Sequence, residues 1–328
     1  MLRCPVVPLL VLFAVVGCAS PAEPSPPDSA TSQSVRLETA TGVLHGTLLV
    51  PGGPGAHPVA LIIAGSGPTD RNGNSPLLPG ANNSLKLLAE GLAEHGVASL
   101  RYDKRGVARS ASAGPEEAEM RFDTFVEDAA AWLRQLKADP RFSSVTVAGH
   151  SEGSLIGMLA APQARADAFV SIAGIARRAS DVLRDQLRPQ LPPDLWQESE
   201  RILGELEAGR TTDSVPAALF ALYRPSVQPY LISWFRHVPI EEIVRLEVPV
   251  LIAQGTTDIQ VTVAEAEALK QARADAELLI IEGMNHVLKT VSPDLAAQHA
   301  SYSDPGLPVA PVLVERTAQL ARSTQRLP

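Results

Sequence analysis

Residues 145–153 have the sequence VTVAGHSEG, and this stretch decides the fold. Its first four residues are β-branched or small, which is typical of a buried strand. The next five match the pattern G-x-S-x-G, in which small residues on both sides of a serine allow a sharp turn from strand to helix. Such a turn presents a hydroxyl above the end of a sheet, so Ser151 is the candidate nucleophile.

Strand-length apolar runs alternate with stretches of helical periodicity on both sides of this motif. The expected strands are residues 43–50, 59–64, 97–102, 145–148, 169–173, 248–253 and 278–281. The expected helices are residues 85–94, 122–137, 151–161, 263–274 and 312–322. This alternation predicts an α/β fold with a mostly parallel central sheet that is flanked by helices.

The alternation stops between residues 177 and 247, where helix-like segments and prolines occur without a convincing strand. We interpret residues 177–247 as a helical cap insertion. One interpretation makes it a set of crossover helices packed on the sheet. The other, which we favour, makes it a lid, because it separates the nucleophile from the next strands that can supply active-site residues.

A serine hydroxyl becomes a strong nucleophile only when a base removes its proton. His286 directly follows the expected strand 278–281, which places its imidazole at the same edge of the sheet as Ser151. Asp258 follows the strand that ends at Ala253, and it is the candidate acid that accepts a hydrogen bond from the imidazole. The other histidines precede the serine, fall in the insertion, or lack a preceding strand.

The oxyanion of an acyl-transfer reaction requires two preorganised N–H donors. The first candidate is the backbone amide of Glu152, which follows the nucleophile. The second is the amide of Ser66, in the loop AGSGP at residues 64–68, where small residues allow close approach of the backbone to a substrate.

Two charged clusters follow expected strand ends and have no assigned role. They consist of Asp70, Arg71, Asp103, Lys104 and Arg105. These side chains could bind a polar group of a substrate. We favour the alternative, in which ion pairs between them brace the two loops.

The first 18 residues are typical of an export signal. Arg3 precedes an apolar run over residues 6–16, which is shorter than a membrane-spanning helix requires. The run ends in VVGC, which resembles the lipobox of bacterial lipoproteins and marks Cys18 as the lipid-attachment site. This predicts secretion across the inner membrane and a membrane anchor at the bacterial cell envelope. The alternative is an ordinary signal peptide that is cleaved near Ala19 or Ala22.

A flexible tether is expected at residues 19–34, because this stretch is rich in Pro and Ser. The catalytic domain is expected to span residues 35–328. Only two cysteines occur, Cys4 and Cys18, so the mature chain can form no internal disulfide. The net charge of −8 opposes nucleic-acid binding, and no metal or nucleotide motif is present, so we expect no cofactor and no metal. No sequence signal indicates an oligomeric state.

Five segments together resemble one group of bacterial α/β hydrolases, the serine aminopeptidase-like (S33-type) and esterase group. They are IAGSGPTDR at 63–71, YDKRG at 102–106, GHSEG at 149–153, GTTD at 255–258 and GMNH at 283–286. The resemblance implies the α/β-hydrolase fold and assigns the catalytic triad to Ser151, Asp258 and His286.

The expected reaction is hydrolysis of a small-molecule carboxylic ester through an acyl-enzyme. The same triad could serve a peptidase, a thioesterase or an acyltransferase. A non-catalytic binding protein on the same scaffold is a further alternative, but such a protein would lack at least one residue of the triad, and all three are present.

Overall fold

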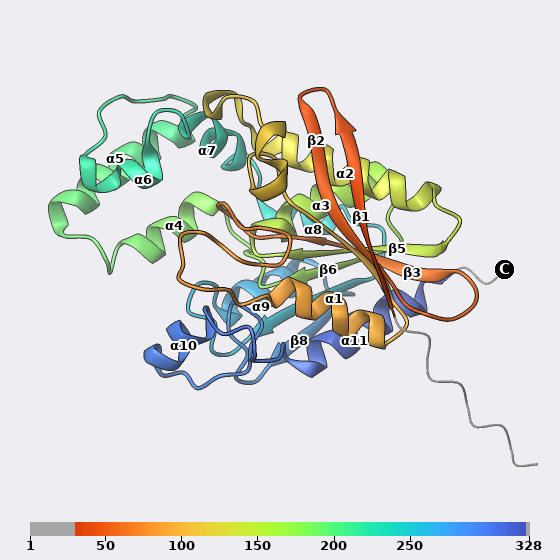
Figure 1. Ribbon diagram of the computed structural model, residues 1–328. Coiled ribbons are helices and arrows are strands. Elements are labelled where there is room, and N and C mark those ends of the chain that lie inside the picture. Colours follow the sequence, from red (N-terminus) through yellow and green to blue (C-terminus); the bar gives the residue numbers. More distant parts are fainter. Residues whose placement is uncertain (1–29, 326–328) are drawn as a thin grey trace, which may run out of the picture.

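An eight-stranded sheet forms the centre of the protein, whose computed structural model describes residues 30–325 (Figure 1). The strands are β1 (Thr31–Thr39), β2 (Gly42–Val50), β3 (His57–Ile63), β4 (Ala98–Tyr102), β5 (Phe142–His150), β6 (Ala168–Ile172), β7 (Val250–Gly255) and β8 (Glu277–Ile281). Their order across the sheet is β1-β2-β4-β3-β5-β6-β7-β8. The pairs β1–β2 and β2–β4 are antiparallel and all other neighbours are parallel, so the predicted, mostly parallel sheet is confirmed.

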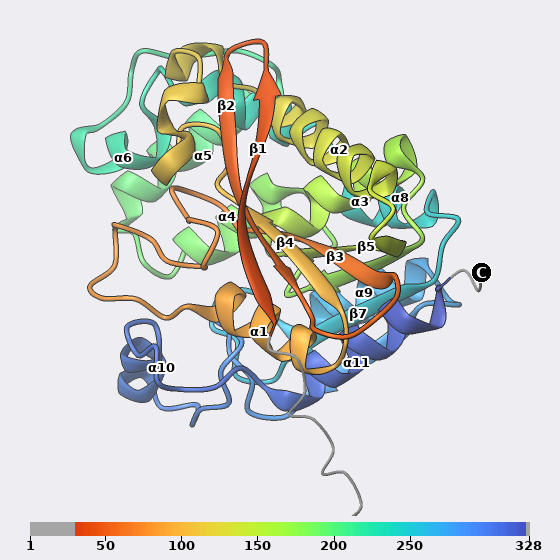
Figure 2. The ribbon, with the colours of Figure 1, turned by 45° about the vertical axis from the view of Figure 1, so that its right-hand side comes forward.

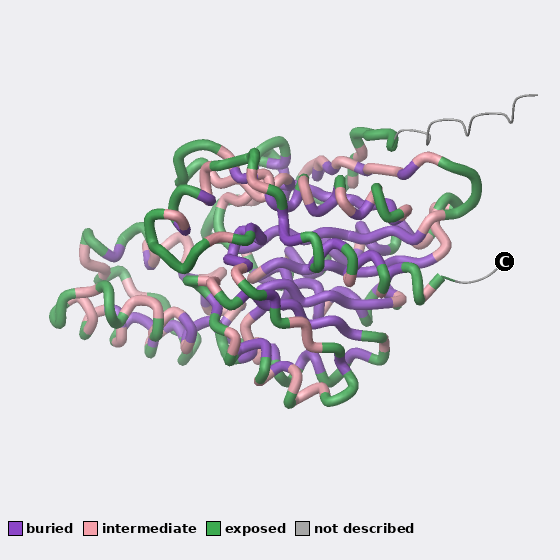
Figure 3. Tube along the Cα trace, turned by 90° about the horizontal axis from the view of Figure 1, so that it is seen from below, coloured by how far each residue is buried: buried purple, intermediate pink, exposed green. Residues whose placement is uncertain are grey.

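Helices cover both faces of this sheet (Figure 2). Those that pack on it are α1 (Ser84–Glu94), α2 (Phe122–Ala138), α3 (Glu152–Ala164), α8 (Pro239–Val244), α9 (Val263–Ala272) and α11 (Pro311–Ser323). Successive strand residues point to opposite faces. In β3, Leu61 and Ile63 therefore join a core with α2, α3, α8 and α9, whereas Ala60 and Ile62 join a core with α1 and α11. Strands β3 to β7 are accordingly buried along most of their length, whereas β1 at one edge is mostly exposed (Figure 3).

The insertion between β6 and β7 is helical, as predicted. Its elements are α4 (Ala179–Leu187), α5 (Pro193–Glu207), a 3₁₀ turn (Ala217–Leu219), α6 (Phe220–Tyr223), α7 (Gln228–Trp234) and α8. Helices α4 to α7 have a hydrophobic core of their own, which includes Ile202, Tyr223 and Leu231. Helix α8 instead packs on the sheet, with Ile243 in the main core. The insertion thus combines a crossover helix with a separately packed helical layer.

The prediction of a tether over residues 19–34 is wrong at its end, because β1 begins at Thr31. Residues 31–34 pair with 47–50 of β2, and their side chains are exposed. Backbone hydrogen bonds to a neighbouring strand suffice for such an edge, so its polar side chains did not indicate a strand. The predicted signal, Cys18 and the rest of the tether lie outside the described residues.

Candidate active site

Ser151 stands at the turn between β5 and α3, as predicted. Its backbone has φ 55° and ψ −121°, a strained conformation for a residue with a side chain. Glycine is required two residues before and two residues after Ser151. A Cβ on Gly149 would lie 2.2 Å from the carbonyl oxygen of Gly153, and one on Gly153 would lie 2.4 Å from that of Ile63. The sharp turn therefore depends on the two glycines of the motif.

Asp258 and His286 lie in the loops that follow β7 and β8, and they are hydrogen bonded. His286 Nδ1 is 2.8 Å from Asp258 Oδ2. The other carboxylate oxygen accepts from the amides of Gln260 (2.7 Å) and Val261 (2.9 Å), which orients the carboxylate. Burial raises the pKa of Asp258, but the charge and hydrogen bond of His286 and the two amides outweigh it and hold that pKa below its usual value. Asp258 is thus a carboxylate that orients the imidazole.

His150 connects this pair to the nucleophile. Its Nε2 donates to the carbonyl oxygen of His286 at 2.8 Å, and the two imidazole rings lie 4.8 Å apart. Burial, followed by the neighbouring His286 charge, lowers the pKa of His150 to about 3, so its ring is neutral. Among the described residues, no hydrogen bond joins the Ser151 hydroxyl to His286.

Sequence reasoning missed the role of His150, because it considered each histidine only as a candidate base. The available signal was its place next to the nucleophile in the G-x-S-x-G motif.

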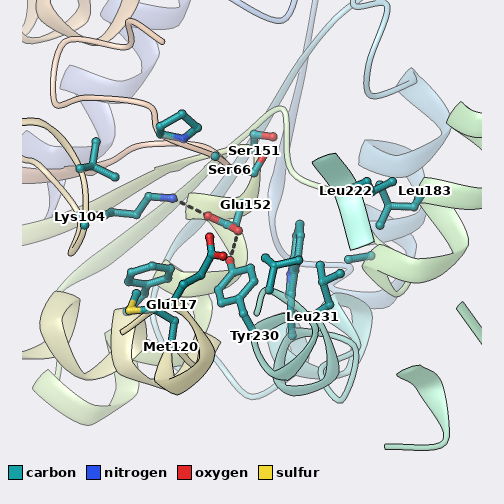
Figure 4. Close-up of a pocket in the computed structure, with 18 of the residues that line it drawn as sticks. Ser66, Lys104, Glu117, Met120, Ser151, Glu152, Leu183, Leu222, Tyr230 and Leu231 are labelled. Carbon is teal, nitrogen blue, oxygen red and sulfur yellow. Dashed lines mark hydrogen bonds and ion pairs between the residues drawn. The ribbon is translucent and has the colours of Figure 1, made fainter. Parts of the chain in front are cut away.

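The residues that carry the two predicted oxyanion donors lie at the Ser151 pocket. Ser66 and Glu152 line the same pocket as Ser151 (Figure 4). The preceding residue of the β3 loop, Gly65, approaches so closely that a Cβ there would lie 3.2 Å from the Cβ of Ser151. Glu152 is the first residue of α3, so its amide has no partner within the helix and lies at the positive end of the helix dipole.

Ion pairs hold the charged loops, in agreement with the favoured prediction. Arg71 and Asp103 form a buried bidentate pair at 2.6 and 3.1 Å, which joins the loops after β3 and β4. Arg105 forms a second bidentate pair with Asp128 of α2, at 2.6 Å on each side. Asp70 accepts hydrogen bonds from the amides of its own loop.

Lys104 forms a third buried pair that sequence reasoning did not predict. Its ammonium lies 2.5 Å from the carboxylate of Glu152 and 2.7 Å from the carbonyl oxygen of Gly65, and it lies over the ring of Phe125. The hydroxyl of Tyr230, in α7 of the insertion, donates to the other oxygen of Glu152 (Figure 4). The side chains of Lys104 and Glu152 are each only 2% exposed.

The pocket in front of Ser151 is a cavity of about 820 Å³. Most of its lining is apolar, and helices α4, α6 and α7 of the insertion form one wall, with Val182, Leu222 and Leu231 among the lining residues. The charged lining residues are Lys104, Arg105, Glu117, Glu152 and Arg224. Each of them is in an ion pair, and Glu117 pairs with Arg224. The cavity thus offers an apolar surface with no unpaired charge.

No group of three or more potential metal ligands occurs among residues 30–325. Within the same range, no helix is long and apolar enough to span a bilayer.

Solved structures share this arrangement of strands and helices. Est1E from Butyrivibrio proteoclasticus, in a structure with bound ferulic acid, superposes with a TM-score of 0.60 over 88% of this chain and 98% of its own, at 19% identity. A thermophilic esterase from Thermogutta terrifontis gives a TM-score of 0.54 over 90% of this chain and 100% of its own, at 14% identity. The chain therefore has the α/β-hydrolase fold.

Sequence comparisons find similarity to two groups of enzymes. Residues 81–203, which include Ser151, match the family model of serine aminopeptidases of the S33 type. Esterase EstD of Thermotoga maritima is 30% identical over 248 residues, which are 75% of this chain and 58% of EstD. The chain therefore spans less than two thirds of the length of this relative.

Proposed function

We propose that this α/β hydrolase is a serine esterase that cleaves carboxylic esters with an apolar acyl group. The observation that supports the proposal most directly is the Asp258–His286 pair, held by His150 beside a strained Ser151 at an apolar cavity. The similarity to EstD is consistent with this reaction.

Each step has a residue in place. His286 takes the proton of Ser151 as the hydroxyl oxygen attacks the ester carbonyl, and Asp258 stabilises the imidazolium that results. The amides of Ser66 and Glu152 stabilise the oxyanion. His286 then gives the proton to the departing alcohol, and a water molecule, activated in the same way, hydrolyses the acyl-enzyme.

The pocket favours an ester over an aminopeptide, despite the name of the matching family model. An aminopeptidase must bind a cationic α-amine, which requires a carboxylate that is free to pair with it. The acidic lining residues are Glu117 and Glu152, and both already hold cations: Glu117 pairs with Arg224, and Glu152 pairs with Lys104. An apolar acyl chain, by contrast, would gain about 25 cal/mol for each Å² that it buries in the cavity.

A paired substrate series tests this proposal. p-Nitrophenyl esters from C2 to C12 are assayed beside aminoacyl p-nitroanilides, with Ser151→Ala as the inactive control and Ser143→Ala, in β5, as the matched control. We expect ester turnover by the wild type and the Ser143 variant, and a loss of about 10⁶-fold in Ser151→Ala. Faster turnover of the anilides than of every ester would reject the esterase in favour of a peptidase.

We also propose that Cys18 anchors the enzyme to the cell envelope through attached lipid. The support is the small-residue sequence VVGC at the end of an apolar segment. Fractionation of cells that express the full chain tests this: the wild type should sediment with membranes and Cys18→Ser should not. Equal partitioning of the two would contradict the anchor.

A further inference from the structure

Lys104 contacts the Gly65–Ser66 peptide group, which carries one proposed oxyanion donor, and the side chain of Glu152, whose backbone amide is the other. We propose that Lys104 is a positioning residue that aligns these two donors with a single ammonium group. The inference rests on the proposed esterase function and adds a residue to it.

The first contact orients the donor of Ser66. The Lys104 ammonium donates to the carbonyl oxygen of Gly65 at 2.7 Å. In a trans peptide, the carbonyl of one residue and the N–H of the next are coplanar and point in opposite directions. Fixing the carbonyl of Gly65 therefore fixes the direction of the Ser66 N–H. Donation from a buried cation also polarises the peptide group, which strengthens its N–H as a donor.

The second contact holds the side chain of Glu152, the residue that carries the other donor. The same ammonium is 2.5 Å from the Glu152 carboxylate, and the backbone N–H of this residue is the other donor. Glu152 is the first residue of α3, so its side chain lies close to the helix end that carries that amide. Lys104 therefore ties the loop after β3 to the start of α3.

Stability alone is a weak explanation for this pair. Removing two charges from water costs about as much as their attraction returns, so a buried ion pair adds little net stability. The Arg71–Asp103 pair already braces the loop after β3 against the loop after β4, and it contacts neither Gly65 nor Glu152. The Arg71–Asp103 pair, which is buried and also starts from the loop after β4, thus serves as an internal control.

Tyr230 links this arrangement to the insertion. Its hydroxyl donates to the Glu152 oxygen that Lys104 does not hold, and burial raises its pKa well above the usual value, so it stays a donor. A shift of α7 would therefore change the position of Glu152. Tyr230→Phe should have the same kind of effect as loss of Lys104, but a smaller one.

The test compares Lys104→Met with Arg71→Met in the full chain, on one p-nitrophenyl ester. We expect Lys104→Met to lower kcat on the order of 10- to 100-fold with KM within about twofold, since the donors act mainly in the transition state. A trifluoromethyl ketone, which Ser151 converts to a tetrahedral oxyanion adduct, should bind more weakly by a similar factor. Arg71→Met should leave both quantities within about threefold, and Lys104→Arg should recover part of the rate.

Three outcomes would overturn the proposal. The first is an equal reduction of kcat in Lys104→Met and Arg71→Met. The second is a change in Lys104→Met that affects KM and leaves kcat unchanged. The third is an unchanged affinity of Lys104→Met for the trifluoromethyl ketone. Thermal unfolding is measured for every variant, and if Lys104→Met does not fold, the isosteric Glu152→Gln is judged by the same criteria. A wild type that hydrolyses no ester would overturn the esterase function and this inference together, whereas an active wild type with an unaffected Lys104→Met would overturn this inference alone.

Discussion

The sheet framework and the helical insertion make different contributions to the site. The framework supplies Ser151, Asp258 and His286 from loops at the ends of β5, β7 and β8. The insertion supplies an apolar wall and has a core of its own. It meets the framework through ion pairs such as Arg224–Glu117 and through Tyr230 and Trp234 of α7, which pack on Phe122 of α2. Under the proposed function, the reaction depends on the framework and the choice of acyl group on the insertion. Substitutions should separate the two.

The largest expected effect is that of His286→Ala. Without a base, Ser151 keeps its proton, and we expect kcat to fall on the order of 10⁵- to 10⁶-fold for every ester tested. The matched control is His237→Ala, a histidine of the insertion that contacts Asp123. If kcat fell as far in His237→Ala as in His286→Ala, the proposed difference between framework and insertion would be wrong.

Asp258→Asn should have the next largest effect. An amide in place of the carboxylate no longer stabilises the imidazolium and favours the wrong tautomer of His286, so kcat should fall about 10⁴-fold. Asp275→Asn, at an exposed acid that pairs with Arg273, is the control and should keep nearly full activity. A reduction of less than tenfold in Asp258→Asn would show that another group orients the base.

His150 should make the free energy of unfolding of the protein decrease at acidic pH. Its pKa is near 3 in the folded protein and near 6.5 when unfolded, so below pH 6.5 the unfolded chain takes up a proton that the folded chain does not. The free energy of unfolding that this difference in pKa contributes is complete above pH 6.5 and is lost as the pH falls toward 3. Between pH 7.5 and 5.0, the wild type should lose about 2 kcal/mol more unfolding free energy than His150→Gln, as measured by urea titration. If the free energy of unfolding fell equally in the wild type and in His150→Gln, the His150 imidazole would not be neutral and buried as described.

The smallest expected effect is a change of acyl preference in the insertion. Leu222 of α6 lines the cavity, and Leu222→Trp should shorten the acceptable acyl chain, with a loss of about fivefold or more in kcat/KM for C10 relative to C4 esters. Phe220→Trp, on the exposed side of the same helix, is the control and should keep the wild-type profile. An unchanged profile in Leu222→Trp would mean that acyl chains do not occupy this wall.

Much of the framework was predictable because its signals are local. Each buried parallel strand is a short apolar run, and Ser151, Asp258 and His286 each follow such a run directly. The fold then brings the ends of these strands to one edge. By contrast, residues 31–34 of β1 have polar, exposed side chains and depend on pairing with β2, so their composition resembled that of a tether.

The supporting contacts of the site could not be predicted, because they join distant residues. Lys104 and Glu152 are 48 positions apart, and Tyr230 is a further 78 positions from Glu152. The sequence shows charges after strand ends, and it predicts that they form ion pairs. The choice of partner depends on how the loops and α7 pack, and no local pattern encodes that.

Covalent labelling of the folded protein with a fluorophosphonate tests the central claim most directly. The account predicts a single phosphonyl adduct on Ser151, identified by mass spectrometry of the peptide, and a labelling rate that falls by several powers of ten in His286→Ala. An adduct on a different residue, or equally fast labelling of Ser151 without His286, would contradict it.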